Sequence, residues 1–284
     1  MFRQAEVSLY LITTLSEIMR TKLYILLSLA AMLISACSYI PEDEQLIYVK
    51  PAPVERSVLL EDFTGQRCVN CPTASLELEK LIEQYGEDAI IAVSIHSGPL
   101  GFHTNPRFYG LSTDVGDALY NHWGFDFQPV GLIDRGSPAE FTSWGALIRE
   151  ELQKTAPVEI DLDVAYGDSL QLSINTQVKS VDGNIQGKLQ IWVVEDNVTA
   201  FQMMPDGTRN DTYTHRHVFR ATVNGLWGDD ITVQEGYAID KEYTFPIDVE
   251  WKLENLSVIA FVYNDSGVLQ VTKAKLQNDD SVEE

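Results

Sequence analysis

The hydrophobic positions of the chain follow two different periods, and the change between them falls close to Pro157. Ahead of it, residues 58–63 and 89–95 form short, nearly continuous apolar runs of the kind found in buried strands. Between the two runs, apolar side chains recur at the spacing of an amphipathic helix, at Leu78, Leu81, Ile82 and Tyr85. The pattern predicts a strand–helix–strand unit, and the intervening helix implies that the two strands run parallel.

The regular pattern is lost over residues 96–128, where glycine and proline are frequent. We interpret this stretch as an insertion that contains one short helix around residues 114–122. Pro129 then precedes another short apolar run at residues 130–134, which predicts a strand. A further helix is indicated by Trp144, Leu147, Ile148 and Leu152, and it has to end before Pro157. Residues 57–156 are therefore predicted to form an α/β domain.

After Pro157 the hydrophobic period becomes two, as in half-buried strands. Apolar side chains alternate with polar ones from Val158 to Tyr166, and again from Leu170 to Ile174. Short strands bounded by polar turns, with no helical stretch, predict an all-β sandwich over residues 157–276, followed by an acidic tail at 277–284. The later strands are expected at residues 187–195, 213–223, 240–249, 255–263 and 267–273.

The N-terminal segment has the layout of an export signal. A short basic stretch at residues 19–22 precedes an apolar run at 23–33, and small residues then lead to Cys37. This resembles the lipobox of bacterial lipoproteins, which implies that residues 1–36 are a signal peptide, with Met19 as an alternative start. It also implies that Cys37 carries lipid such as palmitate. A transmembrane helix is the weaker alternative, because it needs roughly 20 apolar residues.

Residues 37–56 contain three prolines and many charges, which predicts an extended tether between the lipid and the first domain. The acidic residues 42–44 resemble a surface-export tether of Bacteroidetes lipoproteins, and a solvated linker explains them equally well. The whole chain is acidic, with 42 Asp and Glu against 20 Lys and Arg and a net charge of −22. Such a charge repels phosphate backbones, so nucleic acid is excluded as an expected partner.

Two further cysteines, Cys68 and Cys71, lie between the first predicted strand and the first helix. A helix N-terminus offers free N–H groups and positive potential, which stabilise a thiolate. The spacing therefore predicts a nucleophile at Cys68 and a resolving cysteine at Cys71. A static disulfide is the alternative. Half of a zinc site is disfavoured, since the sequence has no second CxxC or CxxH.

This region resembles the thioredoxin fold family. Asp62 lies six residues before Cys68, where the resemblance implies a buried carboxylate that manages protons for the second cysteine. Pro129 precedes a strand, where it implies a cis-proline against the disulfide. Three departures weaken the implied activity. The intervening pair is Val69-Asn70 and not Gly-Pro, Arg67 stands where a tryptophan is usual, and the sequence shows no clear last antiparallel strand after Asp134.

His215 and His217 are the other candidates for chemistry. On a strand, two histidines separated by one residue point to the same face and could bind a metal. Packing or hydrogen bonding at a domain junction is the more common role of such histidines. No cofactor is predicted.

Several motifs in combination resemble the Omp28-related outer membrane lipoproteins of Bacteroidetes. They are the lipobox and residues 68–72, 91–98, 128–135 and 215–228. The resemblance implies an outer-membrane lipoprotein with a thioredoxin-like first domain and an immunoglobulin-like sandwich. Members have been regarded as surface antigens or adhesins.

Two functional hypotheses remain open. The first is a tethered thiol–disulfide oxidoreductase or redox-dependent binder, with protein thiols or disulfides as partners and with Asp62, Cys68, Cys71 and Pro129 as site residues. The second is a non-catalytic surface binding protein or adhesin with a structural disulfide. Unreactive sulfurs buried in the oxidised protein would favour the second hypothesis. Both place the chain at the outer membrane, anchored through Cys37.

Overall fold

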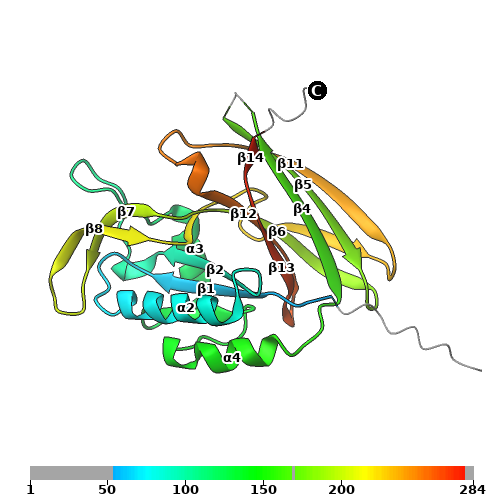
Figure 1. The fold of residues 1–284 in the computed structure, drawn as a ribbon, viewed down its shortest axis with the longest axis horizontal. Helices are drawn as coiled ribbons and strands as arrows, with labels where there is room; N and C mark the ends of the chain where they lie inside the picture. The colour runs from blue at the N-terminus through cyan, green and yellow to red at the C-terminus, as the bar shows by residue number, and fades with distance from the viewer. Residues whose placement is uncertain (1–53, 168–169, 279–284) are drawn as a thin grey trace, which may run out of the picture. The chain divides into compact units, whose positions relative to one another are not determined.

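The computed structural model describes residues 54–167 and 170–278, and its first elements form the predicted strand–helix–strand unit (Figure 1). Strands β1 (Val58–Thr64) and β2 (Ile90–His96) pair in parallel, and every residue of both is buried. Helix α2 (Cys71–Tyr85) connects them. The apolar runs are continuous because both faces of this part of the sheet are covered.

The segment between β2 and Pro157 adds two α-helices and one strand. Helix α3 (Asp114–Trp123) begins after Thr113, whose side chain accepts a hydrogen bond from the Gly116 N–H. Strand β3 (Val130–Ile133) pairs antiparallel with β1, and α4 (Trp144–Glu151) follows. Trp144 is fully buried against Gly131, where an added Cβ would come within 2.3 Å of the indole Nε1. A glycine at position 131 therefore leaves the space that the indole occupies.

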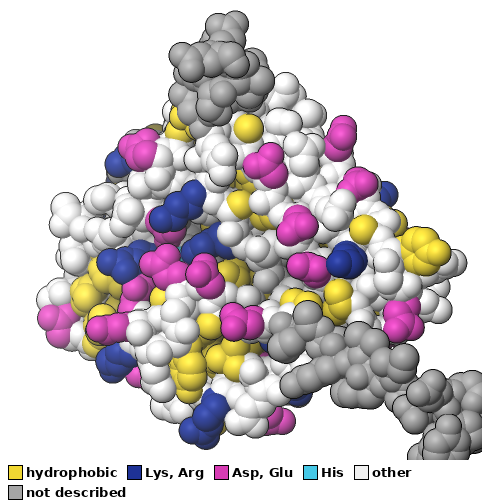
Figure 2. Space-filling view, turned by 45° about the vertical axis from the view of Figure 1, so that its right-hand side comes forward, with side chains coloured by type: hydrophobic (Ala, Val, Ile, Leu, Met, Phe, Trp, Pro, Cys, Tyr) yellow, Lys and Arg dark blue, Asp and Glu magenta, His cyan; other side chains and the backbone are white. Residues whose placement is uncertain are grey.

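The C-terminal strands form two facing sheets, as a β-sandwich requires. One sheet has the order β11-β5-β4-β14. In β5 exposed and buried residues alternate without exception, which explains the period of two in the sequence. On the face shown in Figure 2, acidic and basic side chains are interspersed. The strands of this sheet are β4 (Val158–Tyr166), β5 (Gln171–Ser180), β11 (Ala238–Pro246) and β14 (Gln277–Asn278).

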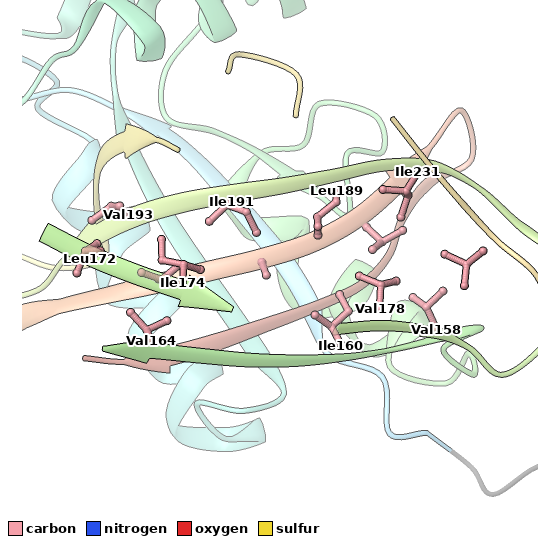
Figure 3. Packing of buried hydrophobic residues seen from close by; sticks show 14 of the residues in the cluster. Val158, Ile160, Val164, Leu172, Ile174, Val178, Leu189, Ile191, Val193 and Ile231 are labelled. Atoms are coloured by element: carbon pink, nitrogen blue, oxygen red, sulfur yellow. The ribbon is translucent and has the colours of Figure 1, made fainter. Parts of the chain in front are cut away.

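The opposing layer belongs to an eight-stranded sheet. It contains β6 (Ile185–Glu195), β10 (Asp229–Val233), β12 (Leu256–Asn264) and β13 (Gly267–Lys275). Aliphatic side chains fill the space between the two layers (Figure 3). Among those labelled in the figure, Ile174 and Val178 come from β5, and Leu189 and Ile191 from β6. The predicted sandwich core is thus built from aliphatic side chains of facing strands.

The eight-stranded sheet continues into the N-terminal unit, in the order β13-β12-β6-β9-β2-β1-β3, with β10 beside β6. Strand β9 (Val218–Thr222) pairs antiparallel with β6 and parallel with β2, where Ser94 and Val218 are partners. The Ser94 N–H donates to the His217 carbonyl at 2.7 Å. Strand β9 thus supplies a partner for the second edge of β2, which would otherwise be unpaired. The segments predicted as separate domains are therefore joined in one sheet.

The prediction of a single strand at residues 213–223 is wrong. The structure divides it into β8 (Arg209–His215) and β9, since His217 adopts a left-handed conformation with φ 55°. Its N–H donates to Asp196 Oδ1 at 2.7 Å. Strand β8 pairs instead with β7 (Val198–Met203), which the sequence pattern did not predict, and the two form a separate hairpin.

Candidate functional site

Cys68 and Cys71 form a disulfide at the start of α2. Strand β1 ends at Thr64, and a short loop carries the chain to the first turn of the helix. There the Cys71 N–H donates to Cys68 Sγ at 3.1 Å. Cys68 is only 2% exposed and Cys71 only 1%. The predicted pair is therefore oxidised and covered.

The β7–β8 hairpin supplies part of this cover. Gln202 on β7 is almost fully buried, and its Nε2 donates to the Cys68 carbonyl at 2.9 Å and to the Gly65 carbonyl at 3.3 Å. The Met203 N–H donates to the Gln66 carbonyl at 2.8 Å. These buried bonds attach the hairpin directly to the loop that contains Cys68. Sequence analysis missed Gln202, because it predicted no strand at β7 and a glutamine by itself carries no signal of burial.

The segment after β2 covers the loop from a second direction. The Arg67 N–H donates to the Leu100 carbonyl at 3.0 Å. Position 65 is glycine because an added Cβ would meet the Leu100 oxygen at 2.2 Å. The Arg67 guanidinium lies over the ring of Phe102, at 4.8 Å from its centroid. The predicted insertion thus packs closely against the CxxC loop.

Asp62 lies on β1, fully buried, and neither of its carboxyl oxygens has a hydrogen-bond partner among the described residues. Burial disfavours the charged form and raises the pKa of Asp62 from 3.8 to about 7, although the nearby His217 acts in the opposite direction. Near neutral pH this carboxyl is therefore divided between its acid and its carboxylate.

Pro129 follows a cis peptide bond from Gln128, as the thioredoxin resemblance implied. The Gln128 side chain holds this turn in place, because its Nε2 donates to the carbonyls of Thr64 at 2.9 Å and Ser97 at 3.0 Å. The bonds link the turn before β3 to the ends of β1 and β2. The structure thus places Pro129 at the same end of the sheet as the CxxC loop.

A pocket of about 550 Å³ lies between α2, the end of β2 and strand β8. Cys71 lines it, together with Glu79, His96, Tyr213, His215 and His217. Asp62 interacts electrostatically with two of these residues, His217 and Tyr213. The pocket, the buried acid and one half of the disulfide therefore belong to one site.

His96 and His215 face each other in this pocket, with ring centroids 5.0 Å apart. His96 Nδ1 and His215 Nε2 are buried and have no hydrogen-bond partner among the described residues. Burial lowers the pKa of His96 well below its usual value and that of His215 to about 4. Both rings are consequently neutral near pH 7.

His217 has different neighbours, because the break between β8 and β9 turns it away from His215. Its Nδ1 lies 3.2 Å from Asp196 Oδ1, and its Nε2 lies 3.4 Å from Glu79 Oε1. Burial alone would lower the pKa of His217, but hydrogen bonds to the two carboxylates outweigh burial and raise it. His217 therefore joins the strand break to α2 as part of an ion-pair cluster.

The metal candidates have different neighbours: His215 packs against His96, whereas His217 lies beside Asp196 and Glu79. Within residues 54–167 and 170–278, no group of three or more His, Cys, Asp or Glu side chains is arranged to hold a metal ion. Cys37 and the predicted signal and tether lie outside the described residues. None of the helices in the described part of the chain is long and apolar enough to cross a membrane.

Fold and site together define a mostly β-sheet protein with a disulfide at a helix start, covered by a β-hairpin. The family model for outer membrane protein Omp28 matches residues 116–280, more than half of the chain. The chain belongs to the Omp28 family and is an outer-membrane protein, and the resemblance stated from its motifs is confirmed.

Solved structures similar to the chain include two from one bacterium. HBP35 of Porphyromonas gingivalis shares the fold, with a TM-score of 0.65 and 18% identity over 81% of this chain and 78% of that chain. A domain of the outer membrane lipoprotein Omp28 from Porphyromonas gingivalis has 24% identity over 43% of this chain and 90% of its own, with a TM-score of 0.34. No curated protein matches the chain.

Proposed function

We propose that this outer-membrane protein is a lipoprotein, anchored through lipid on Cys37, that carries out thiol–disulfide exchange at Cys68 and Cys71. Residues 1–36 would be its signal peptide and 37–56 its tether. Residues 57–156 would form a thioredoxin-like unit, to which the immunoglobulin-like sandwich of residues 157–276 presents partners. The partners would be protein thiols or disulfides at the cell envelope.

The state of Asp62 is the observation that carries the proposal. A buried carboxyl without a hydrogen-bond partner destabilises the fold when it ionises, so a purely structural role does not explain it. With a pKa of about 7 it can both give and take a proton at neutral pH. Strongly shifted pKa values of this kind cluster at functional sites. Reduction of the Cys68–Cys71 disulfide creates thiolates that need such a proton.

In the reduced protein the Cys68 thiolate attacks one sulfur of a partner disulfide, and the other partner sulfur leaves as a thiolate. Cys71 then loses its proton to Asp62 and attacks Cys68 Sγ, which releases the second partner thiol and restores the protein disulfide. The partner gains two electrons and the protein loses them. The Cys71 N–H and the α2 N-terminus stabilise the Cys68 thiolate.

One observation favours a second candidate function, a non-catalytic binding protein with a structural disulfide. Both sulfurs are nearly inaccessible, with Cys68 2% and Cys71 1% exposed. Hydrogen bonds from Gln202 hold the hairpin over the CxxC loop. A folded partner would reach Cys68 only after the hairpin moved away.

The redox equilibrium of the full-length protein in detergent against glutathione separates the two candidates. A potential of roughly −120 to −270 mV supports exchange, whereas a bridge below about −300 mV is structural. In the Cys71→Ser variant, alkylation over a pH range gives the pKa of Cys68, and exchange chemistry requires it below about 8.5. Asp62→Asn should slow exchange near neutral pH, while the exposed-residue control Asp161→Asn should not.

A further inference from the structure

The pocket beside α2 reaches the disulfide from one side only. Cys71 is among its lining residues and Cys68 is not. Cys68 lies instead beneath the β7–β8 hairpin, where Gln202 binds its carbonyl. We propose that low-molecular-weight thiols enter this pocket and attack the sulfur of Cys71, with Cys68 as the leaving group. The inference rests on the proposed exchange function and names its small-molecule substrate class.

The dimensions of the pocket select for a small reactant. Its volume of about 550 Å³ lies within the range of roughly 300–1,000 Å³ that small-molecule sites occupy. Two of the walls come from α2, which contributes Cys71 and Glu79, and from β8, which contributes Tyr213 and His215. A single amino acid or short peptide fits between these walls, and a folded protein does not.

Two histidines that line the pocket, His96 and His215, indicate which thiols it recognises. His96 is 3% exposed and His215 5%, and each has a buried ring nitrogen without a hydrogen-bond partner among the described residues. A buried polar group that stays unpaired is destabilising, so a ligand that pairs with it gains affinity. A neutral imidazole can accept from an ammonium or amide N–H, or donate to a carboxylate. Thiol-containing amino acids and peptides carry these groups, and simple alkyl thiols do not.

The arrangement of the two cysteines also suits departure of Cys68. Thiol–disulfide exchange is faster when the leaving thiol has the lower pKa. Cys68 Sγ accepts a hydrogen bond from the Cys71 N–H at 3.1 Å, at the N-terminus of α2. Both features stabilise a thiolate on Cys68. Cys71, the cysteine that lines the pocket, is therefore the one attacked, and Cys68, whose thiolate is stabilised, is the leaving group.

The reaction balances without another reactant. The incoming thiolate forms a bond to Cys71 Sγ as the bond to Cys68 Sγ breaks, which leaves a mixed disulfide on Cys71 and a thiolate on Cys68. A second thiolate attacks the sulfur of the bound small molecule and releases the Cys71 thiolate, which takes a proton from Asp62. Two thiols are oxidised to one small disulfide, and the protein disulfide is reduced to a dithiol.

Thr214 offers a test because it lines the pocket on β8 while its side chain is exposed. In the full-length protein, Thr214→Trp should lower the rate of reduction by glutathione at least tenfold. It should leave the equilibrium reduction potential unchanged, because the tryptophan blocks access through the pocket and does not alter the Cys68–Cys71 disulfide. The matched control is Thr212→Trp, on the same strand and outside the pocket, which should stay within twofold of the natural protein.

A second measurement locates the attacked sulfur. Reduction with excess glutathione is quenched by N-ethylmaleimide and followed by peptide mass spectrometry, which should show glutathione on Cys71 and maleimide on Cys68. His215→Phe should slow reduction by cysteine and glutathione more than reduction by 2-mercaptoethanol. Glutathione on Cys68, or an unchanged rate in Thr214→Trp, would overturn the inference and leave the exchange function standing. A disulfide that no thiol reduces would overturn the exchange function itself.

Discussion

The buried carboxyl of Asp62 makes a quantitative prediction about stability. In the unfolded chain this group loses its proton near pH 3.8, whereas in the native protein it keeps it up to about pH 7. Between these values the native state binds more protons than the unfolded state, so the free energy of unfolding falls as the pH rises. At about 1.36 kcal/mol for each pKa unit, the shift from 3.8 to about 7 corresponds to about 4 kcal/mol.

The perturbation is Asp62→Asn, which removes the titration and nearly keeps the volume. Urea unfolding of the oxidised protein is measured at pH 5 and at pH 8. In the natural protein, Asp62 should lower the free energy of unfolding by about 3 kcal/mol between these two pH values, because most of the interval from pH 3.8 to about 7 lies between them. Between pH 5 and pH 8 the free energy of unfolding of the variant should therefore fall by about 3 kcal/mol less than that of the natural protein. Comparing each protein with itself cancels the cost of the buried amide.

Asp161→Asn is the matched control, because Asp161 lies exposed on β4 and its loss makes the same change in net charge. This variant should follow the natural protein at both pH values. If Asp62→Asn and the natural protein lose stability in parallel between pH 5 and pH 8, Asp62 does not titrate as a buried acid. The argument for its role in proton transfer would then fail as well.

Three further changes test the packing around the site. Replacing Cys68 and Cys71 by serine should lower the free energy of unfolding in urea by about 2 kcal/mol, because the bridge closes a very short loop; an unchanged value would contradict this. Gly131→Ala should cost about 1–3 kcal/mol in the same assay, since its Cβ would meet an indole at 2.3 Å, whereas Gly167→Ala, with nothing within 4 Å, should change little. His217→Gln should lower the melting temperature more at pH 6 than at pH 9, because a raised histidine pKa adds stability at low pH that is lost as the pH rises through it; equal losses at both pH values would argue against a charged ring.

The sequence predicted the elements whose hydrophobic period is strong. The runs that became β1 and β2 are buried on both faces, and β5 alternates between buried and exposed residues. The position of the CxxC pair followed from its place between two of these elements, whereas the cis-proline was implied by the thioredoxin resemblance. Such local patterns can be predicted because the spacing of apolar residues follows which side chains are buried.

The hairpin over the disulfide could not be predicted in the same way. Strand β8 is largely exposed, with a single buried residue at its end, so its sequence has no apolar alternation. The break at His217 depends on a hydrogen bond to Asp196, a contact between separate elements. The pairing of Ser94 with Val218 is likewise a long-range contact that periodicity cannot reveal. His217 and Ser94, which make these contacts, both line the pocket, and Gln202 of the hairpin covers Cys68.

The pairing of β9 with β2 also determines when the sheet can be completed during synthesis and folding. Ser94 leaves the ribosome well before Val218, and until the later strand arrives one edge of β2 has no partner within the sheet. Such non-local pairing folds slowly and exposes an edge that other chains can join. An outer-membrane protein has to leave the cytoplasm before it reaches its destination. A sheet that only its later strands can complete favours a chain that is still unfolded when export begins.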